Sequence, residues 1–383
     1  MRFSIPPLLV LLGLVACQET PDSSSADAAG PADAPASMVA HGPGPDFVIG
    51  AGTPVEGRPD EPRLRNIRQL TFGGENAEAY FSFDGTKLIY QSSVRGGNGC
   101  DQIFIMDLVT GETNPVSTGE GRTTCSYFFP GGDRVLYSST HHYDQACPAR
   151  PSMAQGYVWP LYPTYDIFVT DPDGSNLVQL TDTGAYDAEA TISPMGDRII
   201  FTSTRDGDLE LYSMALDGSD VQRLTNSPGY DGGAFYSPDG SRIVFRANYP
   251  TSEEALADYQ RLLGEDLIRP SVVDLYVMDA DGSNKVRLTD NGAADFAPFW
   301  HPDGRRIIFS SNADDPTGRG FDLFLIDDDG SNIERITTDP DFDGFPQFSP
   351  DGRFLVFASN RYQERPGETN VFIAEWVEEL PGG

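Results

Sequence analysis

Acidic residues at equivalent positions of a repeat are the side chains best suited to chemistry in this sequence. One column of positions holds four aspartates and a second column, two residues later, holds two glutamates: Asp187, Asp231, Asp295, Asp343, Glu78 and Glu189. Clustered carboxylates raise one another's pKa until a cation compensates them, so this arrangement predicts binding of a divalent cation or a cationic partner. The alternative is that each aspartate accepts hydrogen bonds from the neighbouring repeat, with Arg205 and Arg361 as available partners.

An insertion over residues 141–164 adds a second group of candidate residues, HHYDQACPARPSMAQGYVWPLYPT. Its two histidines, His141 and His142, could ligate zinc or another transition metal together with nearby carboxylates, although their spacing matches no defined metal signature. His141 also occupies the same column as Arg205 and Arg361, where it would replace an arginine in a hydrogen bond. The aromatic content, with Tyr143, Trp159 and Tyr162, suits a recognition loop for a peptide or a sugar ring, or a lid over the mouth.

Three cysteines remain once the N-terminal Cys17 is set aside: Cys100, Cys125 and Cys147. The repeat places all three near one mouth of the channel around which the repeats are arranged. An oxidising compartment favours one disulfide and one free thiol. We predict the pair Cys125–Cys147, with Cys100–Cys125 as the rival. A nucleophilic role for a Cys/His pair has no readable oxyanion-binding device beside it.

A second insertion, over residues 249–271, predicts a short helix. Thr251 or Ser252 can cap its N-terminus, apolar residues recur on one face at helical spacing, and Gly264 ends it. The helix either packs on its own domain or contacts a partner.

The elements that position these residues form an internal repeat. A turn of the type Ser-Pro-Asp-Gly occurs six times with some drift, beginning at residues 82, 129, 193, 237, 301 and 349. Each turn precedes an apolar strand such as RIIFTST, then a second strand such as LELYSMA, then in four repeats an Asp-Gly-Ser turn and a short strand ending in Leu-Thr or Ile-Thr. Four short strands per repeat, six times over, predict an all-β, six-bladed propeller with four-stranded blades and the short helix inserted in blade 4.

The last repeat lacks its outermost strand, and a matching segment, Ile67–Thr71, lies upstream of the first repeat. We therefore predict that this N-terminal strand completes the last blade and closes the ring, which removes an exposed sheet edge.

The turn, the I-x-F-x-S strand and the D-G-S…L-T ending together resemble the TolB-type, WD-like β-propeller repeat over about residues 64–380. The resemblance implies an envelope propeller protein. TolB itself has an α/β domain before its propeller, and here only a tether precedes Phe47, so a Tol–Pal role does not transfer directly. No G-x-S-x-G motif or hydrolase domain follows the propeller, as it does in prolyl oligopeptidase-type enzymes.

The N-terminus predicts export. Arg2 precedes an apolar stretch, Ile5 to Val15, that is too short to span a bilayer, and Leu14-Val15-Ala16-Cys17 resembles a bacterial lipobox. We predict a signal peptide over residues 1–16, a lipidated Cys17 with a Pro/Ala/Ser-rich tether to residue 45, and the propeller over residues 46–383. Gln18 after the cysteine favours the outer membrane over the inner membrane, so the domain would be held in the periplasm.

The charge balance excludes several classes of partner. With 26 Lys+Arg against 58 Asp+Glu the net charge is −32, which argues against binding nucleic acid or docking electrostatically on an anionic membrane. We predict a monomer that contacts the membrane only through its lipid and binds an envelope protein or peptide segment at the mouth. The alternatives are a metal-assisted enzyme acting on polysaccharide, as in oligosaccharide lyases that resemble this repeat, or a Tol–Pal-type component. We predict no cofactor unless a divalent cation occupies the mouth.

Overall fold

Each repeated turn joins two antiparallel strands, and in the turns that keep the serine and the aspartate these side chains hold the turn by hydrogen bonds. In the fourth repeat the Ser237 hydroxyl donates to Asp239 Oδ1 (2.6 Å), and the same oxygen accepts the Ser241 N–H (3.0 Å). Gly240 has φ +72°, a left-handed conformation that glycine adopts without steric cost. The computed structural model describes residues 42–95, 97, 99–315, 318 and 320–380.

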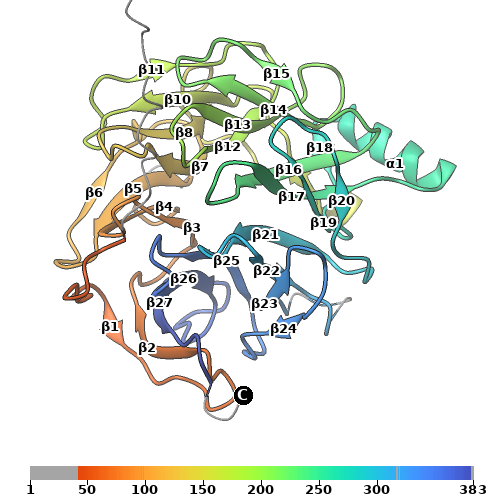
Figure 1. Cartoon of the computed structure of the whole chain (residues 1–383). Coiled ribbons are helices and arrows are strands. Elements are labelled where there is room, and N and C mark those ends of the chain that lie inside the picture. The colour runs from red at the N-terminus through yellow and green to blue at the C-terminus, as the bar shows by residue number, and fades with distance from the viewer. Residues whose placement is uncertain (1–41, 96, 98, 316–317, 319, 381–383) are drawn as a thin grey trace, which may run out of the picture. The chain divides into compact units, whose positions relative to one another are not determined.

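The strands form six antiparallel sheets arranged as the blades of a propeller, in chain order around the ring (Figure 1). Blade 1 comprises β3 (Asn76–Phe81), β4 (Lys87–Ser92), β5 (Gln102–Asp107) and β6 (Thr113–Pro115). Blade 2 comprises β7 (Thr123–Phe128), β8 (Val135–Ser139), β10 (Asp166–Thr170) and β11 (Val178–Gln179). Blade 3 comprises β12 (Asp187–Ile192), β13 (Arg198–Ser203), β14 (Glu210–Ala215) and β15 (Gln222–Arg223).

The second half of the ring repeats this order. Blade 4 comprises β16 (Tyr230–Tyr236), β17 (Arg242–Asn248), β19 (Asp274–Asp279) and β20 (Val286–Arg287). Blade 5 comprises β21 (Asp295–Trp300), β22 (Arg306–Ser311), β23 (Asp322–Asp327) and β24 (Glu334–Arg335). Blade 6 comprises β25 (Asp343–Phe348), β26 (Phe354–Ser359) and β27 (Asn370–Trp376). The predicted six-bladed, all-β propeller is confirmed.

The N-terminal strand closes the ring. β2 (Leu64–Gln69) pairs antiparallel with β27, with Leu64 opposite Trp376 and Gln69 opposite Phe372. Figure 1 shows β2 beside β27 although they lie at opposite ends of the chain. The strand begins three residues before the predicted Ile67, and a further short strand, β1 (Thr53–Pro54), makes this blade five-stranded.

The segment before β1 lies along the junction of blades 6 and 1. The Arg353 guanidinium from blade 6 donates to the carbonyl of Gly44 (3.1 Å), and the Phe47 ring packs on Phe354 at 6.2 Å between centroids. On the blade 1 side, Gly50 N–H donates to the Leu108 carbonyl (3.0 Å).

The core lies between the blades and along the central axis. Buried aliphatic and aromatic residues of adjacent blades pack together, and aromatic rings from four blades meet at the axis. Tyr80 lies 5.7 Å from Tyr127 and 5.6 Å from Phe235, and Phe235 lies 5.2 Å from Phe299, measured between ring centroids. Aromatic packing therefore fills the middle of the propeller.

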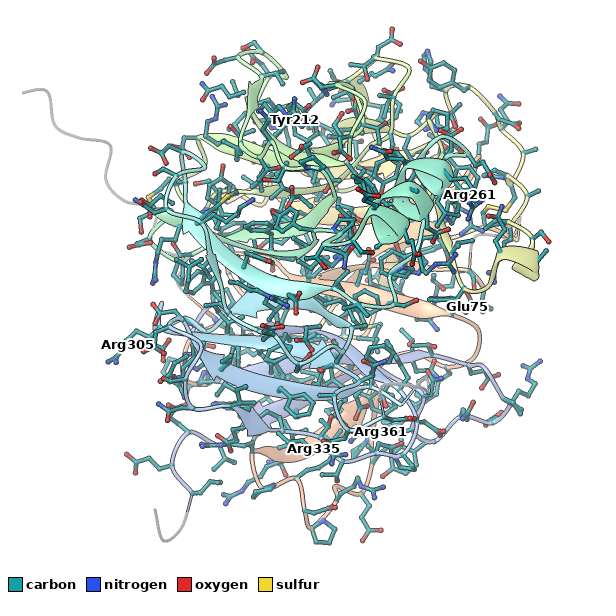
Figure 2. All side chains as sticks on the ribbon, turned by 90° about the vertical axis from the view of Figure 1, so that its right-hand side faces the viewer. Glu75, Tyr212, Arg261, Arg305, Arg335 and Arg361 are labelled. Atoms are coloured by element: carbon teal, nitrogen blue, oxygen red, sulfur yellow. A yellow bond between two sulfur atoms is a disulfide. The ribbon has the colours of Figure 1, made fainter. Side chains whose placement is uncertain are left out.

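Both insertions leave the same face of the ring, which we call the insertion face; the face with the Ser-Pro-Asp-Gly turns is the turn face. Blade 2 contributes the short helix η1 (Met153–Gln155) and β9 (Trp159–Pro160), and blade 4 contributes α1 (Glu253–Leu263) and β18 (Leu267–Ile268). Figure 2 shows Arg261 of α1 on one side of the ring and Arg305, from a turn, on the other. The Ser252 hydroxyl accepts the Ala255 N–H (3.1 Å), so the predicted cap and helix are confirmed.

Candidate functional site

The four aspartates of the predicted rim lie inside the blades with almost no exposed surface. Asp187 accepts from Arg205 (2.8 Å) and Asp343 accepts from Arg361 (2.7 Å), so both predicted arginine partners are confirmed. Each arginine belongs to the same blade as its aspartate, not to the neighbouring blade as we expected.

The other two aspartates have neutral partners. Asp295 accepts from the Ser311 hydroxyl (2.5 Å) and from the Asn291 amide (3.0 Å), and Asp231 accepts from the Tyr249 hydroxyl. Because these four carboxylates are buried and hydrogen-bonded, they do not present an open acidic surface.

The two glutamates of the second column lie at the axis, where the innermost strands bulge. The third residue of each innermost strand, or in blade 4 the fourth, has a left-handed backbone conformation; examples are Glu78 (φ +52°), Cys125 (φ +45°) and Glu189 (φ +57°). Glu78 accepts the Cys125 N–H (3.1 Å), and Glu189 accepts the Gly233 N–H (2.7 Å). Each glutamate thus binds a bulge on another blade.

Arg246 completes this axial cluster. Its guanidinium donates to Glu189 (2.8 Å) and to the Tyr230 hydroxyl (2.6 Å), and it lies 5.5 Å below the Trp159 ring of the insertion. The Thr202 hydroxyl donates to the other oxygen of Glu189 (3.0 Å). Glu189 is therefore fully partnered, and its ion pair with Arg246 lies against the blade 2 insertion.

Glu78 differs from Glu189, because no Lys, Arg or His of the described residues forms an ion pair with it. The pKa of Glu78 is raised to about 7: burial and the nearby Glu189 carboxylate raise it, while the hydrogen bonds from Cys125 and the Arg246 charge act to lower it. Burial, with the Glu78 and Glu189 charges, also raises the pKa of the Cys125 thiol well above its usual value. The axial cluster thus combines a carboxyl of raised pKa with a thiol whose raised pKa disfavours the reactive thiolate.

The disulfide joins Cys100 to Cys147, with the Cα atoms 5.5 Å apart, and Cys125 is free. The predicted pair Cys125–Cys147 and its rival Cys100–Cys125 are both wrong. The bulge turns Cys125 into the axial cluster, where its Sγ lies 3.3 Å from the Thr124 hydroxyl. Cys100 lies just before β5, and its bond therefore pins the blade 2 insertion to blade 1.

The two histidines of the insertion pack against aromatic rings of their own blade. His141 Nδ1 hydrogen-bonds the Ser139 hydroxyl (2.8 Å) and its ring packs on Phe168 at 4.4 Å; the equivalent Arg205 also bonds its own blade's serine, Ser203, at 3.0 Å. Burial, with the neighbouring His142, lowers the pKa of His141. Within the part of the chain that the structure describes, no group of three or more His, Cys, Asp or Glu could hold a metal ion.

The two insertions form one structure, which we call the lid. β9 pairs with β18, so that Trp159 lies opposite Ile268, and Gln155 accepts from Arg261 (2.7 Å) while donating to Glu265 (2.6 Å). Beneath them, aromatic and aliphatic residues of blades 3 to 6 form a continuous apolar cluster with the lid. The lid is therefore bonded to the ring and to itself at several independent points.

Aromatic residues of the lid reach the surface. Tyr143 is 48% exposed and its hydroxyl donates to Asp182 (2.8 Å); Tyr157 is 49% exposed and accepts from Trp159 Nε1 (3.0 Å). Tyr162 donates to the Ala149 carbonyl (2.8 Å). Hydrogen bonds thus orient each of these rings.

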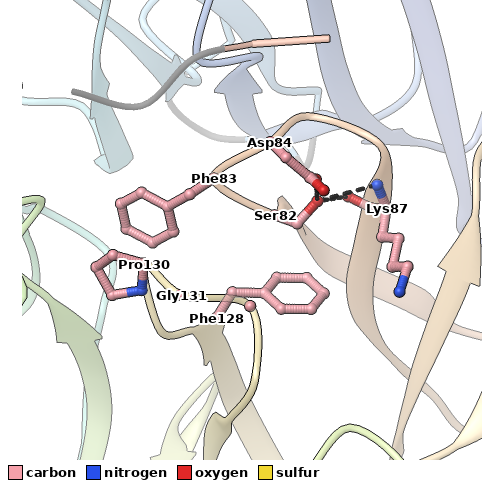
Figure 3. Close-up of a pocket in the computed structure, with 8 residues that line it drawn as sticks. Ser82, Phe83, Asp84, Lys87, Phe128, Pro130 and Gly131 are labelled. Atoms are coloured by element: carbon pink, nitrogen blue, oxygen red, sulfur yellow. Dashed lines mark hydrogen bonds between the residues drawn. The ribbon is translucent and has the colours of Figure 1, made fainter. Parts of the chain in front are cut away.

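A shallow pocket lies on the opposite, turn face, between the turns of blades 1 and 2 (Figure 3). Phe83, Phe128 and Pro130 line it, and Ser82 bonds Asp84 (2.6 Å) beside it. Two of the polar side chains that line it, Ser82 and Asp84, make hydrogen bonds within their own turn, so they are not free to bind a ligand.

Sequence reasoning missed Arg246 and Glu61. At the position of Arg246 the equivalent strands of the other blades have Gln, Ser, Thr or Ala. This departure from the repeat could have marked Arg246 as a residue with a special role. Glu61 lies before β2 and bonds Arg361 (3.0 Å) in a pair that is almost fully buried. No local pattern marks Glu61, because its partner is 300 residues away.

Residues 1–41, with the predicted signal peptide, the lipidated Cys17 and most of the tether, lie outside the described residues. Among the residues described, no helix is long and apolar enough to cross a membrane.

Comparison with known proteins places the chain by its fold. A family model described as the TolB β-propeller domain matches residues 163–261. A protein described as TolB from Agrobacterium tumefaciens is 19% identical, with a TM-score of 0.52, covering 79% of this chain and 91% of that one. TolB from Acinetobacter baumannii is also 19% identical, with a TM-score of 0.53, covering 80% of this chain and 65% of that one.

An oligogalacturonate lyase in complex with manganese is 15% identical, with a TM-score of 0.50, covering 81% of this chain and 80% of that one. At these identities the likenesses show the fold alone. Residues 163–261 are thus similar to the TolB β-propeller domain, and the chain shares its propeller fold with these solved structures.

Proposed function

We propose that this TolB-type propeller is an exported, lipid-tethered protein of the periplasm that binds a protein or peptide segment on its lid. The observation that supports this best is the lid itself. Two of the six blades have long insertions, and these are joined by β9 and β18 and fastened to blade 1 by the Cys100–Cys147 disulfide. A rigid surface loses little conformational entropy on binding, which favours affinity.

The chemistry of the exposed lid residues suits a protein partner. Tyr143 and Tyr157 present large apolar rings with polar tips, and hydrogen bonds already orient them. Aromatic side chains of this kind dominate the binding energy of protein interfaces. Arg150 and Glu75, paired at 3.1 Å between lid and blade 1, add a polar margin.

Site-specific photocrosslinking tests the binding face. A photoreactive phenylalanine would replace Tyr143 or Tyr157 on the lid, and Val109 on the turn face, which is 52% exposed, in the matched control. We expect one shared crosslinked partner from both lid positions and none from Val109. Purified partner should then bind the Tyr143→Ala/Tyr157→Ala protein at least about tenfold more weakly than wild type. Equal crosslinking from Val109, or unchanged affinity, would refute the lid as the binding face.

Fractionation tests the tether separately. We expect the wild-type protein in the membrane fraction and the Cys17→Ser protein in the soluble fraction, because the lipid needs the cysteine thiol. Wild-type protein found in the soluble fraction would contradict lipidation but would leave the lid proposal standing.

A further inference from the structure

All six junctions between blades share one backbone contact. At each junction the first residue of the innermost strand, or in blade 4 the second, donates its N–H to the carbonyl that precedes the third strand of the preceding blade. Examples are Asp231 to Leu209 (2.9 Å), Asp343 to Phe321 (2.8 Å) and Asn76 to Thr369 (2.9 Å). The side chain of the donor residue and the side chain of the residue that begins the third strand are therefore brought together at every junction.

The junction of blades 6 and 1 shows how these side chains meet. Asn76 Nδ2 donates to Asn370 Oδ1 (3.3 Å), so the two positions are within direct hydrogen-bonding reach. Four other junctions have an acid at both positions; the pairs are Asp166/Asp187, Glu210/Asp231, Asp274/Asp295 and Asp322/Asp343. Two ionised carboxylates cannot make the bond that two amides make, because neither has a hydrogen to donate.

The junction of blades 3 and 4 shows the consequence most clearly. Glu210 is 1% exposed and Asp231 is 0% exposed. One oxygen of Glu210 accepts from Arg223 (2.8 Å), and one oxygen of Asp231 accepts from Tyr249. The other oxygen of each carboxylate, Glu210 Oε2 and Asp231 Oδ2, has no hydrogen-bond partner. Buried acceptors left unpaired in this way are costly.

We propose that Glu210 and Asp231 share one proton in the folded ring at neutral pH, forming an acid–carboxylate hydrogen bond in place of the amide bond between Asn76 and Asn370. One proton converts one of the bare oxygens into a donor for the other. It also removes one of two like charges from a site that water does not reach.

The surrounding charges do not supply an alternative. Arg223 is shared between Glu210 and Asp206 (3.6 Å), and Lys285 donates to the Tyr249 hydroxyl (2.6 Å), not to a carboxylate. The remaining titratable groups that interact with Asp231 are hydroxyls, on Tyr249, Tyr259 and Tyr276. The pKa of Asp231 is raised to about 8, in agreement with a bound proton at neutral pH. Burial is the largest cause; the charge and hydrogen bond of Glu210 act in the same direction, while the Tyr249 hydrogen bond and the Lys285 charge act to lower this pKa.

The proton makes ring stability depend on pH. A carboxyl whose pKa is higher in the folded state binds its proton more tightly there than in the unfolded chain. Stability is then greatest in acid and falls as the pH rises toward the folded pKa. The junction of blades 5 and 6 repeats the arrangement, because Asp322 Oδ1 and Asp343 Oδ1 are also without partners.

Asp231→Asn tests the proposal, since its amide supplies the hydrogen permanently. Urea unfolding of the full chain would be followed at about pH 6 and about pH 9. We expect the wild-type unfolding constant to rise at least about tenfold more than that of the variant over this range. Asp239→Asn is the matched control, because hydrogen bonds in its turn lower the pKa of Asp239 and it should keep the wild-type response.

Infrared spectroscopy gives a readout independent of stability. The carboxylic-acid carbonyl band of the folded wild type at about pH 6 should weaken in Asp231→Asn and stay unchanged in Asp239→Asn. If Asp231→Asn does not fold, Glu210→Gln replaces it, with the same expectations. A variant that keeps both the wild-type pH response and the full acid band would overturn the shared proton.

Discussion

The disulfide between Cys100 and Cys147 should be a principal support of the lid. Replacing both cysteines by serine frees the blade 2 insertion from blade 1. The bond closes a loop with a sequence separation of 47, which corresponds to about 4 kcal/mol of unfolded-chain entropy at 25 °C. The other contacts of the lid still restrain the insertion, so we expect a loss of about 2–4 kcal/mol in the free energy of unfolding.

Urea denaturation of the oxidised wild type and of Cys100→Ser/Cys147→Ser measures this loss. Tryptophan fluorescence is a suitable signal because Trp159 lies in the lid, while Trp300 and Trp376 report on blades 5 and 6. Cys125→Ser is the control, since it removes a thiol that forms no disulfide, and it should cost about 1 kcal/mol or less. A double variant as stable as wild type, or a control as unstable as the double variant, would refute the assignment.

Three further variants and one metal measurement test other parts of the ring. Arg246→Met leaves Glu189 buried without its cation, so urea unfolding should show a loss of about 3–5 kcal/mol that Glu189→Gln partly restores; a loss below about 1 kcal/mol would contradict the ion pair. Ile67→Ala in β2 should cost about 2–5 kcal/mol because Ile67 is buried, whereas exposed Arg65→Ala should cost almost nothing; equal losses would argue against the closing strand. Glu78 has a raised pKa of about 7, so wild type should lose stability as the pH rises from about 5 to about 8, and Glu78→Gln should lose less in thermal melts; parallel curves would count against the buried carboxyl. Elemental analysis of protein purified without chelator should find no stoichiometric manganese or zinc, and a full equivalent of either would favour the metal-assisted enzyme.

The repeat could be predicted because its signals are local. Ser237, Asp239 and Gly240 fold their turn through contacts within five residues, and the spacing of such turns gives the blade count. The pairing of Asp187 with Arg205 follows from two columns of the same blade. The closing strand could be predicted because the last repeat lacks its outermost strand. A matching segment before the first repeat can fill that place.

The rest of the site depends on contacts between blades, which the sequence does not encode locally. Cys125 fits a disulfide by position, but its bulge turns it toward the axis, and Cys100 takes Cys147 instead. The pairing of β9 with β18 joins two insertions more than a hundred residues apart along the chain. Their composition suggested a lid and a helix, and it could not show that they meet.

The closing strand also sets the order in which the protein can fold. β2 precedes every strand of blades 1 to 5 along the chain and its partner β27 follows them, so the ring can close only after every blade has been synthesised. Long-range pairing of this kind slows folding and leaves strand edges open to wrong partners meanwhile. Loss of the chain from Asn370 onward should therefore disable the whole ring and not only its last blade, since β27 bonds both β2 and β26.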